Sequence, residues 1–275
     1  MKLGIISGWQ DGHLKAVSEK GLSAVEFCIN DKTDSAVVLA QKESIKKSSQ
    51  KYGVEVGAIG RWGMLRIDEN GDIIPAALQH DKNLIELAGF LGCPVYNTGC
   101  NYIEGKSYYE NCLFAINYFK TLIDFAAPLG VKIAVYNCDW CNFVYNEKAW
   151  SPILGALPEL GIKYDTSHAI NRRSNYLREM RDWGERFYHV HIKGHLRVAG
   201  DGYDDPPAGL DQTDWRSVMC LLYIKNYDGM LSIEPHSGEW KGGKGQWGID
   251  FTIKYISQFI MPQSYEHIEV SPYMP

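Results

Sequence analysis

Several features that would mark other classes of protein are absent from this 275-residue chain. No apolar run approaches the roughly 20 residues that cross a bilayer, and the N-terminal MKLGIISGW is too short an apolar run for a signal peptide. Acidic residues (33) outnumber lysine and arginine (28), so the net charge of −5 offers no basic field to a phosphate backbone. We therefore expect neither a membrane nor a nucleic acid as a partner.

Cysteine is also sparse, and its pattern excludes a dense disulfide framework. The seven cysteines are odd in number and scattered, which favours reduced thiols and a cytoplasmic location. Cys138 and Cys141 have the spacing of a thiol pair, but no second pair accompanies them, so coincidence is the better explanation. A glycine-rich dinucleotide fingerprint is missing as well, because Ser7-Gly8-Trp9-Gln10 follows the first apolar run.

What the chain does have is a regular alternation of apolar, strand-like runs and helix-like stretches. Several runs are nearly continuous in valine, isoleucine, leucine and alanine, as expected of parallel strands covered on both faces. Eight strands are predicted: Lys2–Ser7, Ala24–Cys28, Val54–Ile59, Val95–Thr98, Val131–Tyr136, Ile162–Asp165, Tyr188–Ile192 and Met230–Glu234. Helices are predicted over Ser35–Lys51, Pro75–Leu91, Ser107–Leu129, Glu147–Leu160, Asn171–Arg186, Thr213–Asn226 and Gly248–Ile260.

The ends of the predicted helices follow one rule, which indicates the fold. Gly53, Gly92 and Gly130 each close a helix just before the next strand, as a left-handed cap does. Eight strand–helix units in this length predict a single-domain (β/α)8 TIM barrel over residues 1–275, with an open doubly wound sheet as the alternative. Long polar loops that could close over a substrate follow the third, seventh and eighth strands, at Gly60–Pro75, Gly194–Asp214 and Ser237–Gly248.

Three short polar clusters, each at the end of a predicted strand, suggest the chemistry. Asp165 begins DTSH after LGIKY, His191 lies in HVHIK after ERFY, and Glu234 lies in SIEPH after DGML. Catalytic groups collect at the carboxyl ends of barrel strands, so the three side chains can meet there. Two acids and an imidazole suit one divalent metal. Each residue alone could be an ordinary polar strand end, but three in successive strands favour the metal site.

Other polar and aromatic residues have two interpretations each. Glu26 ends the second strand, where it could line the barrel or be a buried structural carboxylate. Trp62 and Trp140 follow predicted strands and could stack on a sugar ring or serve in ordinary packing. Arg61 and Arg66 could meet a phosphate or a carboxylate, or be simple exposed arginines.

These motifs resemble those of the xylose-isomerase-like TIM-barrel family of sugar isomerases and epimerases, which includes hydroxypyruvate isomerase, inosose dehydratase and ketose 3-epimerases. The resemblance covers essentially the whole chain and is sharpest in YDTSH, HVHIKG, PAGLDQTDW and LSIEPH. It implies that Asp165, His191 and Glu234 bind one divalent cation, manganese first, with magnesium, cobalt and zinc as other candidates. It also implies substrate contacts from three further residues, His168, Lys193 and Arg197.

Tyr136 is where the chain departs from the family pattern. Family members have Glu-Asn where this chain has Tyr136-Asn137, and in the epimerases that glutamate is both a ligand and one half of the acid/base pair. Tyr136 could ligate the metal or act as an acid, because a phenol beside a cation has a lowered pKa. Alternatively, a three-ligand site with water survives, which we favour, or metal and catalysis are both lost.

The function implied by the resemblance is isomerisation or epimerisation of a small sugar or polyol. The metal would bind the carbonyl and the adjacent hydroxyl and stabilise an enediolate, while Glu234 moves the proton beside the carbonyl. The alternatives are a dehydratase acting on a keto-sugar or inosose, and a non-catalytic carbohydrate-binding barrel. A DNA-repair endonuclease on the same fold ranks low, because the chain is acidic and lacks the strand-5 glutamate. A homo-oligomer is compatible with a large barrel.

Overall fold

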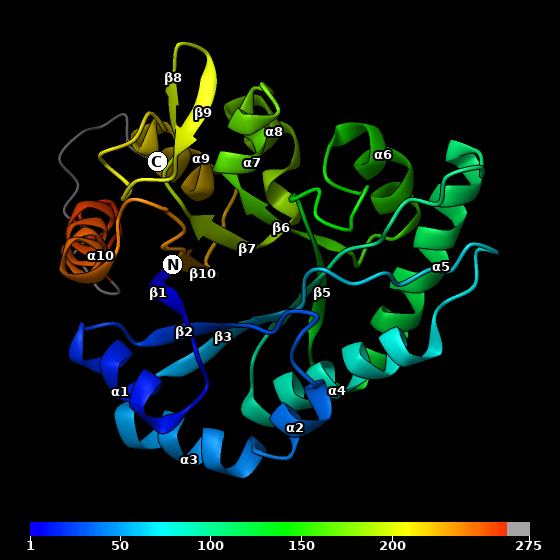
Figure 1. The fold of residues 1–275 in the computed structure, drawn as a ribbon, viewed down its shortest axis with the longest axis horizontal. Coiled ribbons are helices and arrows are strands. Elements are labelled where there is room, and N and C mark those ends of the chain that lie inside the picture. Colours follow the sequence, from blue (N-terminus) through cyan, green and yellow to red (C-terminus); the bar gives the residue numbers. More distant parts are fainter. Residues whose placement is uncertain (263–275) are drawn as a thin grey trace, which may run out of the picture.

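Eight parallel strands close into a barrel in the computed structural model, which describes residues 1–262 (Figure 1). Barrel strands that follow one another in the chain pair side by side, and β1 pairs with β10 to close the ring. The strands are β1 (Lys2–Ser7), β2 (Ala24–Cys28), β3 (Glu55–Gly60), β4 (Val95–Thr98), β5 (Lys132–Tyr136), β6 (Gly161–Asp165), β7 (Phe187–Ile192) and β10 (Met230–Ile233). The predicted TIM barrel is confirmed, with strand boundaries shifted by one residue at most.

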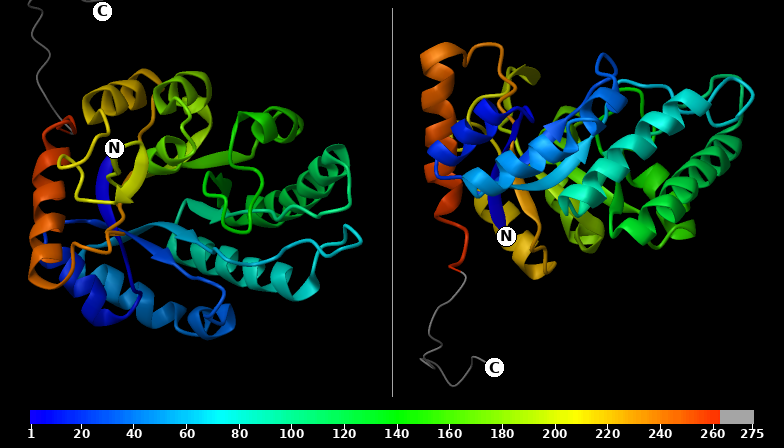
Figure 2. Two further views of the ribbon diagram at one scale, coloured as in Figure 1. Left: turned by 45° about the horizontal axis from the view of Figure 1, so that its top comes forward. Right: turned by 90° about the horizontal axis from the view of Figure 1, so that it is seen from below.

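Helices surround the outside of the barrel, as Figure 2 shows from two further directions. They are α1 (Asp11–Glu19), α2 (Ser35–Leu39), α3 (Lys42–Tyr52), α4 (Pro75–Leu91), α5 (Tyr108–Ala126), α6 (Glu147–Ala156), α7 (Thr166–Asn171), α8 (Tyr176–Trp183), α9 (Trp215–Ile224) and α10 (Gly242–Ser257), with 3-10 turns at Ala127–Leu129 and Gly184–Arg186. The left-handed glycine caps expected before the strands are present at Gly53, Gly92 and Gly130.

Several predicted helices are wrong in their extent. Helix α10 begins at Gly242, six residues before the predicted start, and α6 ends at Ala156, four residues before the predicted end. The predicted helix Ser35–Lys51 is divided into α2 and α3 at Gln41, whose amide donates to the Val37 carbonyl and accepts from the Trp9 indole, each at 3.2 Å. The predicted helix Asn171–Arg186 corresponds to α8 and the 3-10 turn Gly184–Arg186, whereas α7 precedes this range and shares only Asn171 with it. There, α7 begins after Asp165 and α8 begins after Asn175, and both residues cap their helices through side-chain oxygens.

Two elements were not predicted at all. Helix α1 follows β1 directly, without a side chain that caps its first turn. The loop after β7 contains an antiparallel hairpin of β8 (Leu196–Val198) and β9 (Asp201–Asp204), which projects from the barrel in Figure 1. Its two-residue turn places Ala199 and Gly200 at φ of 51° and 93°, the left-handed backbone that tight hairpins use.

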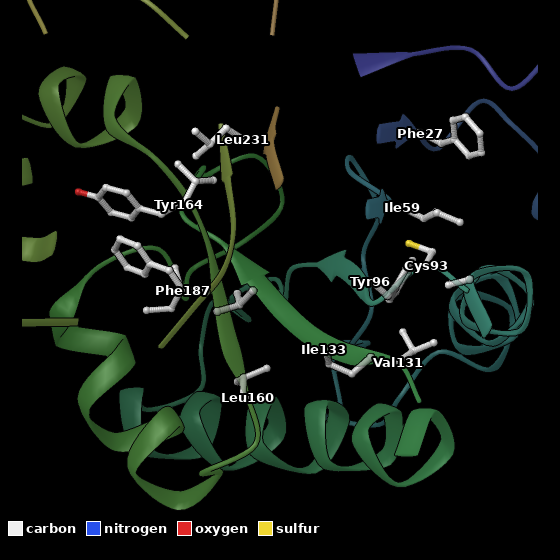
Figure 3. Close-up of a cluster of buried hydrophobic side chains, with 14 of the residues drawn as sticks. Phe27, Ile59, Cys93, Tyr96, Val131, Ile133, Leu160, Tyr164, Phe187 and Leu231 are labelled. Carbon is white, nitrogen blue, oxygen red and sulfur yellow. The ribbon is translucent and has the colours of Figure 1, made fainter. Parts of the chain in front are cut away.

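Alternation along the strands separates an apolar outer layer from a polar interior. Aromatic and aliphatic side chains pack between strands and helices, as Figure 3 shows for Phe27, Ile59, Tyr96 and Ile133 among others. The residues that alternate with them are polar and buried, including Glu26, Asn97, Lys163, Asp165, His189, His191 and Ser232. The barrel interior is therefore lined with hydrogen-bonding and charged groups.

Helix α5 and the turn after it, residues 108–129, form the one stretch among residues 1–262 that is long and apolar enough to cross a membrane by length and composition. This stretch is part of the barrel wall, because α5 contacts β5, α4 and α6. Its apolar face includes Cys112, Ala115, Phe119 and Leu122, which are buried. The hydrophobicity of α5 is thus explained by the barrel core.

Candidate functional site

Three neighbouring strands bring the predicted metal ligands together. Asp165 on β6 is in register with His191 on β7, and the backbone N–H of Glu234, just past β10, donates to the Ile192 carbonyl at 3.1 Å. One ligand atom from each of Asp165, His191 and Glu234 lies within 4.8 Å of the other two. The structure therefore places these three side chains at the carboxyl ends of adjacent strands, where the alternation argument located them.

The two carboxylate oxygens of Asp165 have different tasks. Oδ1 accepts from the Ser167 backbone N–H at 2.8 Å and so caps α7. Oδ2 is buried and accepts no hydrogen bond of normal geometry within the described residues. It lies 3.9 Å from His191 Nδ1 and 3.1 Å from the Lys193 ammonium. A buried carboxylate oxygen without a donor is what a cation-binding position requires.

The orientation of His191 is fixed by Glu26, a residue whose role sequence reasoning left open. Glu26 Oε2 lies 2.8 Å from His191 Nε2 and 2.9 Å from His189 Nε2, and all three side chains are buried. Burial alone would raise the pKa of Glu26, but the two imidazoles outweigh it and hold that pKa well below its usual range. With Nε2 bound to Glu26, His191 presents Nδ1 to Asp165 and Glu234, as metal-binding histidines do.

Lys193 is the nearest cation to the two acidic ligands. Its ammonium lies 3.1 Å from Asp165 Oδ2 and 3.5 Å from Glu234 Oε2, and the side chain is buried. Burial would raise the pKa of both carboxyls, but Lys193 outweighs it and keeps both below their usual range. Both acids are thus ionised at neutral pH.

His168 stands on the outer side of this cluster. Its Nε2 lies 3.4 Å from Asp165 Oδ2 and 3.5 Å from the Lys193 ammonium. Burial lowers the pKa of His168 to about 3, with Asp165 opposing the shift. The imidazole is therefore neutral at physiological pH and offers one donor and one acceptor nitrogen.

Tyr136 ends β5 inside the barrel, but its hydroxyl is already engaged. The hydroxyl donates to the Trp140 carbonyl at 3.1 Å, and the ring stacks on Trp62 with centroids 5.5 Å apart. Burial raises the pKa of Tyr136 above its usual value of about 10, against the pull of the Arg66 charge. The residue contributes a neutral phenol where the family pattern has a carboxylate.

The remaining predicted substrate contacts lie further out. Arg197, on β8, donates to the carbonyls of Ile170 and Gly200, so its guanidinium connects the hairpin to α7. Trp62 is buried against Tyr136, whereas Trp140 is 48% exposed. These contacts connect the loops to one another, and substrate binding by the three side chains stays a prediction.

Three buried cations were not expected from the sequence. Lys163 is 1% exposed, and its ammonium lies 3.8 Å from Asp165 Oδ2. Arg61 and Arg66, which could have been exposed, are both buried. Arg61 donates to backbone carbonyls of the loop after β2, and Arg66 lies 3.8 Å from Asp81. The alternation that placed Asp165 inward also places Lys163 inward, which is the signal that could have found it.

The hairpin loop and the loop after β10 are connected beside Glu234. Asp205 accepts from His195 and from His236, each at 2.9 Å, and the Ser237 hydroxyl donates to Asp204 at 2.7 Å. The side-chain hydrogen bond to Asp205 raises the pKa of His236, although burial opposes it. The two loops predicted to close over a substrate are therefore joined by side-chain hydrogen bonds.

One pocket is lined by His168, and a second pocket shares Asp139 with it. One of about 270 Å³ is lined by Asp139, His168, Asn171 and Arg172. A second, of about 440 Å³, shares Asp139 and is lined by aromatic and polar side chains that include Tyr102, Tyr108, Phe143, Tyr145, Asn146 and Lys148. Most residues that line the second pocket come from the loops after β4 and β5.

The fold and the position of this site define a class. A (β/α)8 barrel whose polar side chains gather at the carboxyl ends of its strands is a TIM barrel with its candidate site in the usual place for such proteins. More narrowly, the chain belongs to the xylose isomerase-like TIM barrel family, whose model matches residues 14–255. No curated protein matches the chain significantly by sequence.

Solved structures share the fold at low sequence identity. The IolI protein with a bound zinc atom superposes with a TM-score of 0.75 at 17% identity, covering 94% of this chain and 99% of that one. The 3-keto-D-glucoside 4-epimerase YcjR from E. coli gives 0.74 at 16% identity, with 94% and 99% covered. Mannonate dehydratase from Streptococcus suis gives 0.74 at 14% identity, with 94% and 93% covered. Epimerases and dehydratases thus share this architecture.

Proposed function

We propose that the protein is a metal-dependent enzyme that isomerises or epimerises a small sugar or polyol by removing a proton next to a carbonyl group. The observation that supports this most is the convergence of Asp165, His191 and Glu234 within 4.8 Å at adjacent strand ends. Both acids are ionised, and the histidine is oriented by Glu26. The three side chains thus offer metal-binding atoms, and the hydrogen bond from His191 to Glu26 holds the imidazole in place.

The residues present fit one divalent cation. Asp165 Oδ2, His191 Nδ1 and a Glu234 oxygen would hold it, since two carboxylates and an imidazole suit manganese, magnesium, cobalt or zinc. Asp165 Oδ2 supports this assignment, because it is buried among cationic and imidazole groups and accepts no hydrogen bond of normal geometry among the described residues. When bound, the cation would act as a Lewis acid toward the oxygens of the substrate. Manganese is our first candidate.

The chain's own residues would handle the proton and the oxygens. Glu234 is the ionised carboxylate nearest the mouth, partly exposed at 19% of its side chain, and it would accept the proton from the carbon beside the carbonyl. Lys193 and neutral His168 would donate hydrogen bonds to the oxygen that becomes negative, since they lie 3.5 Å apart and both adjoin Asp165 Oδ2.

The state of Tyr136 bears on the type of reaction. Its hydroxyl is used by the Trp140 carbonyl and its pKa is raised, so it is a poor candidate for a second proton carrier or a ligand. A site with one base favours isomerisation or the elimination of a hydroxyl over two-base epimerisation. A dehydratase is therefore the second candidate function.

The two pockets that share Asp139 support a sugar as the ligand. Tyrosine and phenylalanine rings beside aspartate, asparagine and lysine are what carbohydrate sites use, because a ring packs on the apolar face of a sugar while polar groups bind its hydroxyls. The pocket next to His168, about 270 Å³, is close to the lower limit for small-molecule sites.

Exchange of deuterium from solvent tests the proposal without knowledge of the product. The manganese-loaded protein is incubated in D₂O with D-fructose, D-allulose, D-tagatose, a 3-keto-glucoside and an inosose, and NMR follows each substrate. Deuterium next to the carbonyl of at least one sugar is expected with the wild type and not with E234Q. If no sugar exchanges while binding persists, the barrel is a carbohydrate-binding protein instead.

A further inference from the structure

The interior of the barrel holds two lysines that face the proposed acidic ligands. Lys163 lies two residues before Asp165 on β6, and Lys193 lies two residues after His191, so all four side chains point to the same side of their strands. The ammonium of Lys193 lies 3.1 Å from Asp165 Oδ2 and 3.5 Å from Glu234 Oε2. That of Lys163 lies 3.8 Å from Asp165 Oδ2.

The charges of this cluster are already nearly balanced. Two carboxylates, Asp165 and Glu234, lie beside the ammonium groups of Lys163 and Lys193, whose two positive charges equal that of one divalent cation. The third buried carboxylate, Glu26, pairs with His189 and His191 instead. Without such cations the buried carboxylates would be costly to ionise. The lysines therefore keep the metal-free site folded and charge-compensated.

A metal and Lys193 would contend for the same two oxygens. Divalent ions bond carboxylate oxygens at about 2.0 to 2.2 Å. An ion bonded to Asp165 Oδ2 would therefore lie no more than about 5 Å from the ammonium nitrogen, which is 3.1 Å from that oxygen. Two positive groups so close repel strongly in a site with little water.

Tyr136 favours the lysines in their competition with a metal ion. A neutral phenol ends β5, in register with Lys163 on β6, so β5 presents no carboxylate to the site beside this lysine. The hydroxyl is held by the Trp140 carbonyl, and no negative charge from β5 offsets the lysines. We propose that Lys193, assisted by Lys163, is a built-in cation that competes with the divalent metal for Asp165 and Glu234 and sets the metal affinity.

This inference rests on the proposed metal site, and titration with MnCl₂ followed by calorimetry tests it. K193M removes the charge and keeps an unbranched side chain of similar length. We expect K193M to bind Mn²⁺ at least tenfold more tightly than the wild type, and K163M to change in the same direction by less. K2M is the matched control, because Lys2 pairs with Glu55 in a half-exposed ion pair at the amino-terminal end of the barrel strands; its affinity should stay within threefold of wild type.

Thermal unfolding gives a second readout. K193M leaves two carboxylates without their cation, so the metal-free variant should melt below the wild type, and Mn²⁺ should raise its Tm by more than it raises that of the wild type. If K193M does not fold without metal, recovery of its circular dichroism spectrum on adding Mn²⁺ supports the competition, and K163M repeats the affinity measurement.

The outcomes separate this inference from the proposed function. Equal or weaker Mn²⁺ binding by K193M, with a wild type that binds, overturns the competition and leaves the metal enzyme standing. Binding by K193M alone supports the competition and shows that lysine has displaced the metal from the wild-type site. Binding by neither protein overturns both.

Discussion

Replacing Glu26 by glutamine should test how far the site depends on a carboxylate outside the proposed ligand set of Asp165, His191 and Glu234. Glu26 Oε2 accepts from His189 at 2.9 Å and His191 at 2.8 Å, and Oε1 accepts from the Asn97 amide at 3.3 Å. Glutamine keeps the shape and removes the charge. Hydrogen bonds to charged groups contribute about 1.5–3 kcal/mol and neutral ones about 0.5–1.5, so weakening the two histidine bonds should cost about 2–3 kcal/mol.

The new amide group of E26Q also places one hydrogen-bond donor against another. If its oxygen faces the histidines, its NH₂ group faces the Asn97 amide, and this conflict favours the upper end of the range. Because His191 loses the partner that fixes its ring, Mn²⁺ affinity should fall about 10- to 100-fold.

Urea unfolding followed by circular dichroism measures the stability, and calorimetry measures metal binding. E55Q is the control, since Glu55 pairs with Lys2 on a surface where both side chains are about half exposed, and its stability should stay within about 0.5 kcal/mol of wild type. An E26Q protein as stable as E55Q would show that the histidine pair does not need the charge. Mn²⁺ affinity within threefold of wild type would show that Glu26 does not orient His191.

Three further expectations follow from the same geometry. Y136E supplies a carboxylate at the end of β5 and should tighten Mn²⁺ binding at least tenfold. The same substitution should lower the free energy of unfolding by about 3 kcal/mol, because the ring stack on Trp62 is lost. Calorimetry measures the affinity and urea unfolding the stability, and an unchanged Mn²⁺ affinity would refute the expectation. Chelation with EDTA should abolish deuterium exchange, and Mn²⁺ should restore it in the wild type but not in D165N. The His236–Asp205 contact, with its raised histidine pKa, should stabilise the fold fully below about pH 6.5 and lose effect as pH rises above that, so the Tm difference between wild type and H236Q should shrink with increasing pH.

The barrel and the convergence of the Asp165, His191 and Glu234 side chains could be predicted because both rest on local patterns. Apolar runs closed by glycine caps mark each strand–helix unit, and strand alternation puts His191 and Glu234 on inward faces. What failed was continuity within helices. At the break, Gln41 accepts a hydrogen bond from Trp9, a residue 32 positions away, and no local sequence pattern contains that contact.

The supporting residues of the site were harder to predict for a similar reason. Glu26 is separated from His191 by 165 residues, and only the closure of the barrel brings its carboxylate against the imidazoles of His189 and His191. Lys163 carried a usable signal, since it shares a face with Asp165, but a lysine in a strand is ordinarily expected at the surface. The Tyr136 hydroxyl points to Trp140 because of a loop conformation that strand periodicity does not determine.

The arrangement of charge across the site bears on which reactions it can support. Glu234 is an ionised carboxylate, whereas the Lys193 ammonium is already protonated and His168, with its lowered pKa, is a weak proton acceptor. Epimerisation requires a proton to leave one face of a carbon and return to the opposite face, which is most direct with a carboxylate on each side. Isomerisation and elimination can return or release the proton from the same base. We infer that the loss of the strand-5 carboxylate at Tyr136 moves this chain toward one-base chemistry. Deuterium that enters recovered substrate with its configuration unchanged would indicate a single base, whereas deuterium confined to an inverted product would indicate two bases.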